Sequence, residues 1–304
     1  MRSKIRRILV AVADANAARV IRRASDLALK SGATLELFSV VRPDSRILGL
    51  PNPTLLEINK LTAEQRRAAL ERRARPLRRR GLEVSCTVVT HDSLSDSVAA
   101  RLKQAPADLV AIEAHRHGTL ARLFLLQSDY ELIRYCPVPL LIVKKPASAD
   151  KPVLAAIDPW HKNRKPRNLD ARIIAAAHWV SRTAGAPLHS VHVYSPLLGL
   201  VDSSPFAPVV LPVSLPEEKA HAARIRGRFR TLNERYGISA KRSHLEVGDP
   251  AFLLPQVARS LKAQLVVMGA VSRSALRRFV VGSTAERVLD ELGCDVLIVK
   301  PAGR

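Results

Sequence analysis

The chain has 304 residues, of which 47% are hydrophobic, so it is long enough for two domains and too apolar for an intrinsically disordered protein. Its formal net charge of +22 favours polyanionic partners and says nothing about the fold. Its three cysteines are too few and too scattered for a disulfide framework or a zinc site, and we expect the reducing cytoplasm as its location.

The first predicted element is a β-strand over residues 8–13. Basic residues precede this apolar run, as they do in an export signal, but the run is too short for one and Asp14 closes it. A similar segment recurs at residues 153–158, in the middle of the chain, where no export signal could act. No apolar run approaches the roughly 18 residues that a membrane helix needs, so we expect no membrane partner.

After this strand, helices and strands alternate along both halves of the chain. One helix ends at Gly32 and its counterpart at Gly185, where glycine provides the positive φ of a helix end. Further strands are predicted at residues 35–41, 84–89, 108–112 and 139–143, with counterparts at 188–194, 243–247, 264–268 and 295–299. This alternation indicates a parallel sheet covered on both faces, whose ligands bind beyond the carboxyl ends of the strands.

The two halves are copies of each other. Residues 107–144 align without a gap over residues 263–300, and Gly32 aligns with Gly185. We therefore predict two tandem domains, 1–146 and 151–304, with a Pro/Ser/Lys linker at residues 144–152. Each copy ends in an apolar strand that would be an exposed edge if left alone, so we expect the copies to form an intramolecular pseudo-dimer. Further homo-oligomers stay open at this point.

The second copy contains a loop suited to phosphate, at residues 269–284. A strand runs into Gly269, a basic loop follows, and Gly282-Ser283-Thr284 opens a helix. The free N–H groups and the dipole of a helix N-terminus favour anions. The alternative is purely structural, with Gly282 in a turn and Ser283 to Glu286 as a capping box. The two interpretations are compatible.

The spacing of this loop resembles the G-x2-G-x9-G-S/T motif of universal stress proteins. Gly269, Ser272, Gly282 and Ser283 stand at its positions, and Asp158 matches the aspartate that contacts nucleotide in ATP-binding members. The first half is similar to the first half of E-type tandem members. The resemblance implies an α/β fold of two tandem doubly wound, Rossmann-like domains, each with a five-stranded parallel sheet flanked by helices.

The resemblance also implies a cytoplasmic stress-response protein that binds an adenine nucleotide such as ATP through its second domain. The residues that we expect at this site are Asp158, Val193, Gly269, Ser272, Arg273, Gly282, Ser283 and Thr284. Ser272 departs from the motif, and a non-glycine residue with positive φ costs about 1–2 kcal/mol, or roughly tenfold in affinity. Positive charge on Arg273 and its neighbours in the loop could offset that cost.

In the first copy the motif is lost. Glu113 stands for Gly269, Arg116 for Ser272, Leu126 for Gly282 and Gln127 for Ser283. A carboxylate in place of the first glycine repels phosphate, while Ser128 and Glu131 keep a capping box for the helix. We therefore predict a structural or regulatory first domain.

No catalytic or metal site is predicted. His115 and His117 form an HxH pair without a visible third ligand, so a solvated loop is favoured over a metal centre. The chain shows no nucleophile elbow, paired carboxylates or Cys/His arrangement, and we do not expect an enzyme.

Two further features leave alternative functions open. Residues 65–81 form an arginine-rich helix, which is either a solvated helix face or a surface for nucleic acid, although aromatic residues do not alternate with the arginines. Residues 195–218 form a long, apolar, proline-rich loop that we expect to pack between the domains. The alternatives to a nucleotide-binding protein are a nucleic-acid-associated protein and a nucleotide-independent scaffold for an apolar ligand or a protein.

Overall fold

The computed structural model describes most of the chain. The described residues are 5–13, 17–42, 52–116, 123–125, 127–145, 150–159, 168–196, 198–201, 209–212, 214–270 and 283–301. None of the helices in these ranges is long and apolar enough to span a bilayer.

The first half alternates strands and helices as the sequence predicts. Its elements are β1 (Arg7–Ala11), α1 (Ala18–Ser31), β2 (Thr34–Val41), α2 (Asn52–Arg79), β3 (Val84–Thr90), α3 (Leu94–Gln104), β4 (Leu109–Glu113), β5 (His115–Arg116), β6 (Leu123–Phe124), α4 (Gln127–Tyr135) and β7 (Leu140–Val143). The two-residue strands β5 and β6 pair with each other.

The second half repeats this order. Its elements are β8 (Val153–Ala156), α5 (Leu169–Ala184), β9 (Leu188–Tyr194), β10 (Leu198–Val201), β11 (Val209–Pro212), α6 (Leu215–Arg235), the short 3-10 helix Ala240–Arg242, β12 (Ser243–Val247), α7 (Pro250–Ser260), β13 (Leu265–Gly269), α8 (Ser283–Glu291) and β14 (Asp295–Val299). Helices α1 and α5 end at Gly32 (φ 68°) and Gly185 (φ 71°), which confirms the left-handed helix ends predicted from the sequence.

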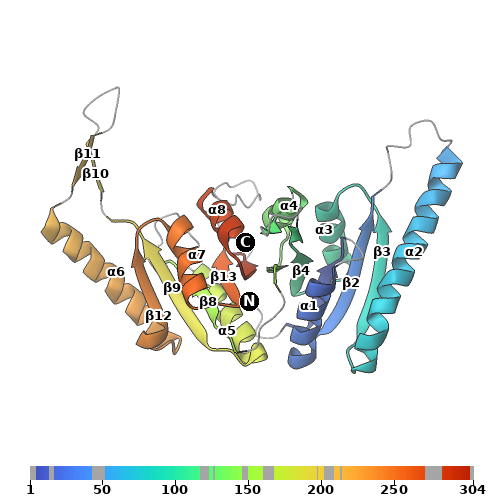
Figure 1. The fold of residues 1–304 in the computed structure, drawn as a ribbon, viewed down its shortest axis with the longest axis horizontal. Helices are drawn as coiled ribbons and strands as arrows, with labels where there is room; N and C mark the ends of the chain where they lie inside the picture. Colours follow the sequence, from blue (N-terminus) through green and yellow to red (C-terminus); the bar gives the residue numbers. More distant parts are fainter. Residues whose placement is uncertain are drawn as a thin grey trace.

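All ten long strands belong to one sheet, in the order β12-β9-β8-β13-β14-β7-β4-β1-β2-β3 (Figure 1). Neighbouring strands are parallel within each half, and both halves share one strand order, so the predicted doubly wound α/β fold is confirmed. Between the halves, β14 pairs antiparallel with β7, with Leu297 opposite Leu141. The two apolar last strands thus cover each other's edges, as expected for an intramolecular pseudo-dimer.

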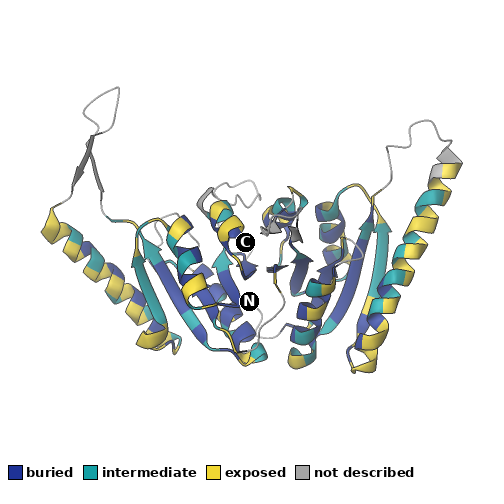
Figure 2. Cartoon of the chain, in the orientation of Figure 1, coloured by how far each residue is buried: buried dark blue, intermediate teal, exposed yellow. Residues whose placement is uncertain are grey.

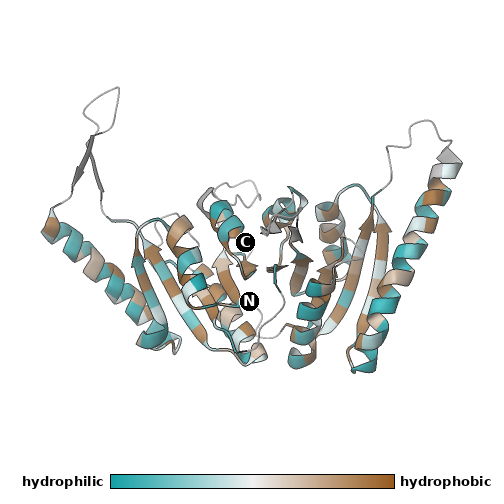
Figure 3. Cartoon of the chain, viewed as in Figure 1, coloured by the Kyte–Doolittle hydropathy of each residue, from teal (hydrophilic) through white to brown (hydrophobic). Residues whose placement is uncertain are grey.

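Helices cover both faces of the sheet. One apolar cluster joins α1, α2, α5 and α6 to one face, and a second joins α3, α4, α7 and α8 to the other. Both clusters run through both halves. Figures 2 and 3 show buried, apolar strands at the centre and exposed, hydrophilic outer sides on α2 and α6.

Buried polar groups also join the halves. Asp295 at the start of β14 is 2% exposed and lies 3.3 Å, Oδ2 to Nε, from Arg23 of α1. Its Oδ1 accepts hydrogen bonds from the backbone N–H groups of Lys144 (2.9 Å) and Lys145 (3.2 Å). The Lys144 ammonium, buried beneath α8, donates to the Leu292 carbonyl at 2.9 Å. A charged side chain of each half therefore contacts groups of the other half at this seam.

The long loop of the second half differs from its predicted role. Residues 198–201 and 209–212 pair antiparallel as the β10–β11 hairpin, which forms a small sheet of its own. In Figure 1 the hairpin lies beyond β9 and α6, on the side away from the first half. The prediction that these residues pack between the domains is therefore wrong. The hairpin follows β9, and β9 lies on the outer side of its half.

The seam predicts how the second half behaves alone. A fragment of residues 151–304 would expose the edge of β14, where Val296, Leu297 and Ile298 pair with β7 in the full chain. We expect this fragment to dimerise through that edge or to aggregate, whereas the full chain supplies its own partner strand. Sedimentation velocity distinguishes the two states, and a soluble monomeric fragment would contradict the prediction.

Candidate functional site

Three predicted residues lie in one row at the carboxyl ends of adjacent strands. β8 pairs with β9 up to Ala156 opposite Val191, and with β13 up to Ala155 opposite Val267. Continued two residues beyond these last pairs, the registers place Val193 opposite Asp158 and Gly269 opposite Ile157, on the two sides of β8, so the three predicted residues lie within one residue of a common row. This edge is the topological switch point of the half, because β8 has β9 on one side and β13 on the other.

Helix α8 completes this edge. Because α8 returns from the end of β13 to the start of β14, its first residue, Ser283, lies at the carboxyl edge. Ser272, Arg273 and Gly282 lie outside the described residues. The structure thus groups Asp158, Val193, Gly269 and the start of α8 at the edge where the motif predicts a ligand.

Gly269 has a packing role that needs no ligand. A Cβ atom at this position would lie 2.8 Å from Leu169 Cδ2 and 3.1 Å from Ile173 Cδ1, both on α5. Glycine here lets α5 approach β13 closely. The first glycine of the motif is therefore explained by helix–strand packing, whatever binds above it.

The first half shows what a carboxylate does at the equivalent position. Glu113 Oε1 accepts a hydrogen bond from Arg19 Nε at 2.7 Å, and its Oε2 accepts one from the Val20 backbone N–H at 3.0 Å. The guanidinium of Arg19 also donates to the carbonyls of Ala114 and Lys144. An anionic group thus neutralises an arginine and binds a backbone N–H in the first turn of α1.

The second half keeps the arginine and lacks the carboxylate. Counted from the glycines that end α1 and α5, Arg172 occupies the position of Arg19, and Gly269 replaces Glu113. The buried Nε of Arg172 has no hydrogen-bond partner in the part of the chain that the structure describes. Burial lowers the pKa of this guanidinium, and no carboxylate among the described residues offsets that effect. In the described chain, Arg172 therefore stands at the position of Arg19 without the carboxylate that pairs with Arg19 in the first half.

The neighbouring polar residues hold the edge in place. The side chain of Asp170 is 3% exposed and accepts a hydrogen bond from the Asp158 backbone N–H at 3.0 Å. This bond fixes the backbone of the half-buried Asp158 just after the end of β8. His192, 5% exposed, has Nδ1 3.0 Å from the Ile157 carbonyl and its ring 6.1 Å from that of Phe229. His192 therefore supports the strands and α6 from below the edge.

Comparison with known proteins identifies the family. The family model described as "Universal stress protein family" matches residues 4–144 and again residues 151–300. The chain belongs to the universal stress protein family. It is 30% identical over 266 residues to universal stress protein E of Escherichia coli, covering 82% of this chain and 80% of that protein. A homologue in Photorhabdus laumondii is 25% identical over 253 residues, 81% of this chain and 78% of that protein.

Solved structures agree with the fold. A functionally unknown protein from Pseudomonas aeruginosa has a TM-score of 0.77 and 27% identity, covering 99% of this chain and 94% of its own. A universal stress protein from Archaeoglobus fulgidus, 17% identical, has a TM-score of 0.67, with 98% of this chain and 97% of its own covered. This universal stress protein therefore shares a two-half architecture with solved proteins.

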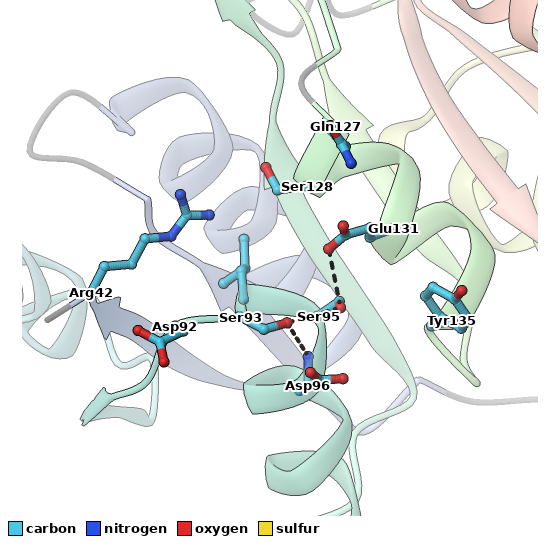
Figure 4. A pocket seen from close by; sticks show the side chains of 10 residues that line it. Arg42, Asp92, Ser93, Ser95, Asp96, Gln127, Ser128, Glu131 and Tyr135 are labelled. Atoms are coloured by element: carbon cyan, nitrogen blue, oxygen red, sulfur yellow. Dashed lines mark hydrogen bonds between the residues drawn. The ribbon is translucent and has the colours of Figure 1, made fainter. Parts of the chain in front are cut away.

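The carboxyl edge of the sheet in the first half, which corresponds to the candidate site of the second half, has an acidic pocket. A pocket of about 790 Å³ lies between the starts of α3 and α4 (Figure 4). It contains three carboxylates, Asp92, Asp96 and Glu131, and one cation, Arg42. This charge balance disfavours phosphate, in agreement with the loss of the motif there.

The glutamates of the two predicted capping boxes both contact a neighbouring helix. Helix α4 begins at Gln127, one residue before Ser128, and Glu131 accepts a hydrogen bond from Ser95 of α3 at 3.5 Å. In α8, Glu286 accepts one from Arg134 of α4 at 3.2 Å. Both glutamates are engaged by a neighbouring helix because α4 packs beside α3 and, at the seam, faces α8.

Sequence reasoning missed Arg172. The signal was present in the repeat itself, since Arg172 and Arg19 are equally far from their helix-ending glycines. The motif does not indicate this arginine, because the motif covers the loop at residues 269–284 and Arg172 belongs to the preceding helix α5. Among the described residues no group of three or more His, Cys, Asp or Glu side chains could hold a metal ion, and His117 lies outside them.

Proposed function

We propose that this universal stress protein binds an adenine nucleotide at the carboxyl edge of its second half. The observation that carries the proposal is a difference between the two copies. Glu113 pairs with Arg19 in the first half, whereas in the second half Gly269 replaces the glutamate and the buried Nε of Arg172, at the position of Arg19, has no partner among the described residues. An anionic group of the ligand would take the place that the Glu113 carboxylate holds in the first half.

The residues at this edge have distinct roles in the proposal. Phosphate oxygens would accept hydrogen bonds from Arg172 and from the N–H groups at the start of α8, whose dipole favours anions. The Asp158 carboxylate would accept hydrogen bonds from hydroxyl or amino groups of the nucleoside, beside Val193 on β9. Ser272, Arg273, Gly282, Ser283 and Thr284 would complete the phosphate loop, as the motif predicts.

The proposed role is binding, without a chemical step. No nucleophile or acid–base pair is predicted at this edge, so we infer a nucleotide-binding protein of the stress response and not an enzyme. A cytoplasmic location is part of the proposal and rests on the scattered, unpaired cysteines and on the family.

Arg172→Gln tests the proposal. We expect the wild-type chain to bind ATP in calorimetry and the variant to bind it about tenfold or more weakly, because a charged hydrogen bond is worth about 1.5–3 kcal/mol. The matched control is Arg182→Gln, which removes an exposed arginine from the last turn of the same helix and is expected to leave the affinity unchanged. Equal affinity in Arg172→Gln, or no binding by the wild type, would rule the proposed site out.

The arginine-rich helix α2 is the basis for a second predicted class of partner, nucleic acid. The apolar side of α2 packs on β2 and β3 through Leu70, Ala74 and Leu77. Its outer side carries the exposed residues Arg67, Arg72, Arg75 and Arg79. These arginines suit either a solvated face or a polyanion such as nucleic acid, and the scaffold alternative likewise stays a prediction.

A further inference from the structure

A cation-rich cavity lies at the opposite edge of the sheet from the proposed nucleotide site. It occupies about 380 Å³ where β7 ends and β8, β13 and β14 begin. Four cations line it, Lys145 and Lys151 from the two ends of the linker and Arg259 and Lys262 from the end of α7. We call this cavity, with Gln264 and Cys294 on its inner wall, the linker groove.

The charges of the linker groove do not cancel. Glu291 is the one carboxylate in its lining. Within the described chain, none of the four cations has an ion pair with a carboxylate. The ends of α7 and α8 contribute about half a negative charge each. Together with Glu291 they offset about two of the four positive charges in the lining, and the exposed Asp150 beside Lys151 offsets up to about one more, so a surplus of about one to two remains.

The inner wall is already satisfied by the protein. Gln264, 8% exposed, accepts a hydrogen bond from Arg23 at 3.0 Å and donates one to the Lys151 carbonyl. Burial raises the pKa of the Cys294 thiol to about 12, so it stays neutral. The groups of the linker groove that keep a surplus charge are therefore cations, which leaves an anion as the ligand that it favours.

The first copy provides an internal comparison. At the positions of Lys262, Gln264 and Lys145, the other copy has Pro106, Asp108 and Pro301. There the Asp108 carboxylate accepts hydrogen bonds from the backbone N–H groups of Arg6 (2.8 Å) and Arg7 (3.2 Å). Each of these three differences makes the linker groove more positive than its counterpart.

Backbone strain accompanies one of these cations. Among the described residues, the non-glycine residues with positive φ are Asp150 (70°) and Lys262 (52°), and both lie at the linker groove or beside it. Lys262 follows the end of α7, with its N–H bonded to the Arg259 carbonyl at 2.9 Å, a position that usually favours glycine. A lysine is thus kept where the backbone alone would favour glycine, which points to a role for its charge.

We propose that the linker groove binds a small, multiply charged anion of the phosphate-ester or polyphosphate class. Its volume suits a compact ligand, and four cations converging on one cavity suit a group with more than one negative charge. Because two of the cations, Lys145 and Lys151, flank the linker and the other two lie at or just after the end of α7, the bound anion would also bring the charges of these separate segments together.

Inorganic tripolyphosphate is the probe for the test. It is titrated by calorimetry at low salt into full-length protein that carries Arg172→Gln, so that the proposed nucleotide site does not contribute. In this background we expect one binding site. Lys262→Gly is expected to weaken binding about tenfold and, because glycine relieves the strain, to leave Tm unchanged or raised. Adding Arg259→Ser is expected to weaken binding by about another tenfold.

Lys103→Ser is the matched control. Lys103 stands at the position of Arg259 in the first copy and is exposed on the equivalent helix, and we expect its loss to leave the affinity unchanged. Absence of binding would overturn the proposal. So would an equal loss in Lys103→Ser, which would trace the affinity to the overall net charge of +22. Unchanged affinity in Lys262→Gly would also overturn it.

Discussion

Asp295→Ala is expected to lower the free energy of unfolding by about 3–5 kcal/mol, because it leaves a buried guanidinium without its carboxylate. Arg23 is 4% exposed and lies in the interior between the two halves. The substitution also removes the acceptor of two backbone N–H groups, those of Lys144 and Lys145, that end β7. Denaturation in urea, followed by circular dichroism, measures the loss.

An exposed ion pair at the same seam provides the matched control. Arg134 of α4 and Glu286 of α8 lie 3.2 Å apart and are 45% and 35% exposed. Glu286→Ala is expected to cost less than about 1 kcal/mol, because water screens this pair. A loss below about 1 kcal/mol in Asp295→Ala would show that the buried pair does not hold the halves together.

Leu169→Ala/Gly269→Glu is expected to abolish nucleotide binding while the protein stays folded. It imitates the first copy's ion pair, in which Glu113 neutralises Arg19. The added carboxylate would pair with Arg172 and repel phosphate, so we expect ATP affinity to fall about a hundredfold or more. Leu169→Ala is needed because Leu169 Cδ2 would lie only 2.8 Å from a Cβ atom at residue 269.

Leu169→Ala alone is the control for this exchange. It is expected to lower stability through the cavity that it creates, by about 2–5 kcal/mol, and to keep ATP binding. The double variant should recover part of that stability, because the glutamate fills the space and pairs with Arg172. Calorimetry with ATP and thermal unfolding separate the two effects. Binding within tenfold of wild type in the double variant would place the anion elsewhere.

The sequence by itself determined the order of the sheet strands and of their covering helices, and with it the doubly wound fold, because the elements follow from local patterns; the short strands β5, β6, β10 and β11 were expected to be loops. Apolar runs between helices mark the strands, and Gly32 and Gly185 mark helix ends through their positive φ. The repeat of residues 107–144 at 263–300 also implied two copies of one unit. The loop motif indicated where to look for a ligand, although Ser272, Arg273 and Gly282 lie outside the described residues.

Only the tertiary structure decided what each charged group faces, since such contacts join residues far apart in the chain. Asp295 meets Arg23 because β14 pairs antiparallel with β7, a register that no local pattern encodes. Gly269 contacts α5 because the crossover from β8 lays that helix over β13. The same sheet order brings the linker and the end of α7 to one edge, where their cations line a common groove.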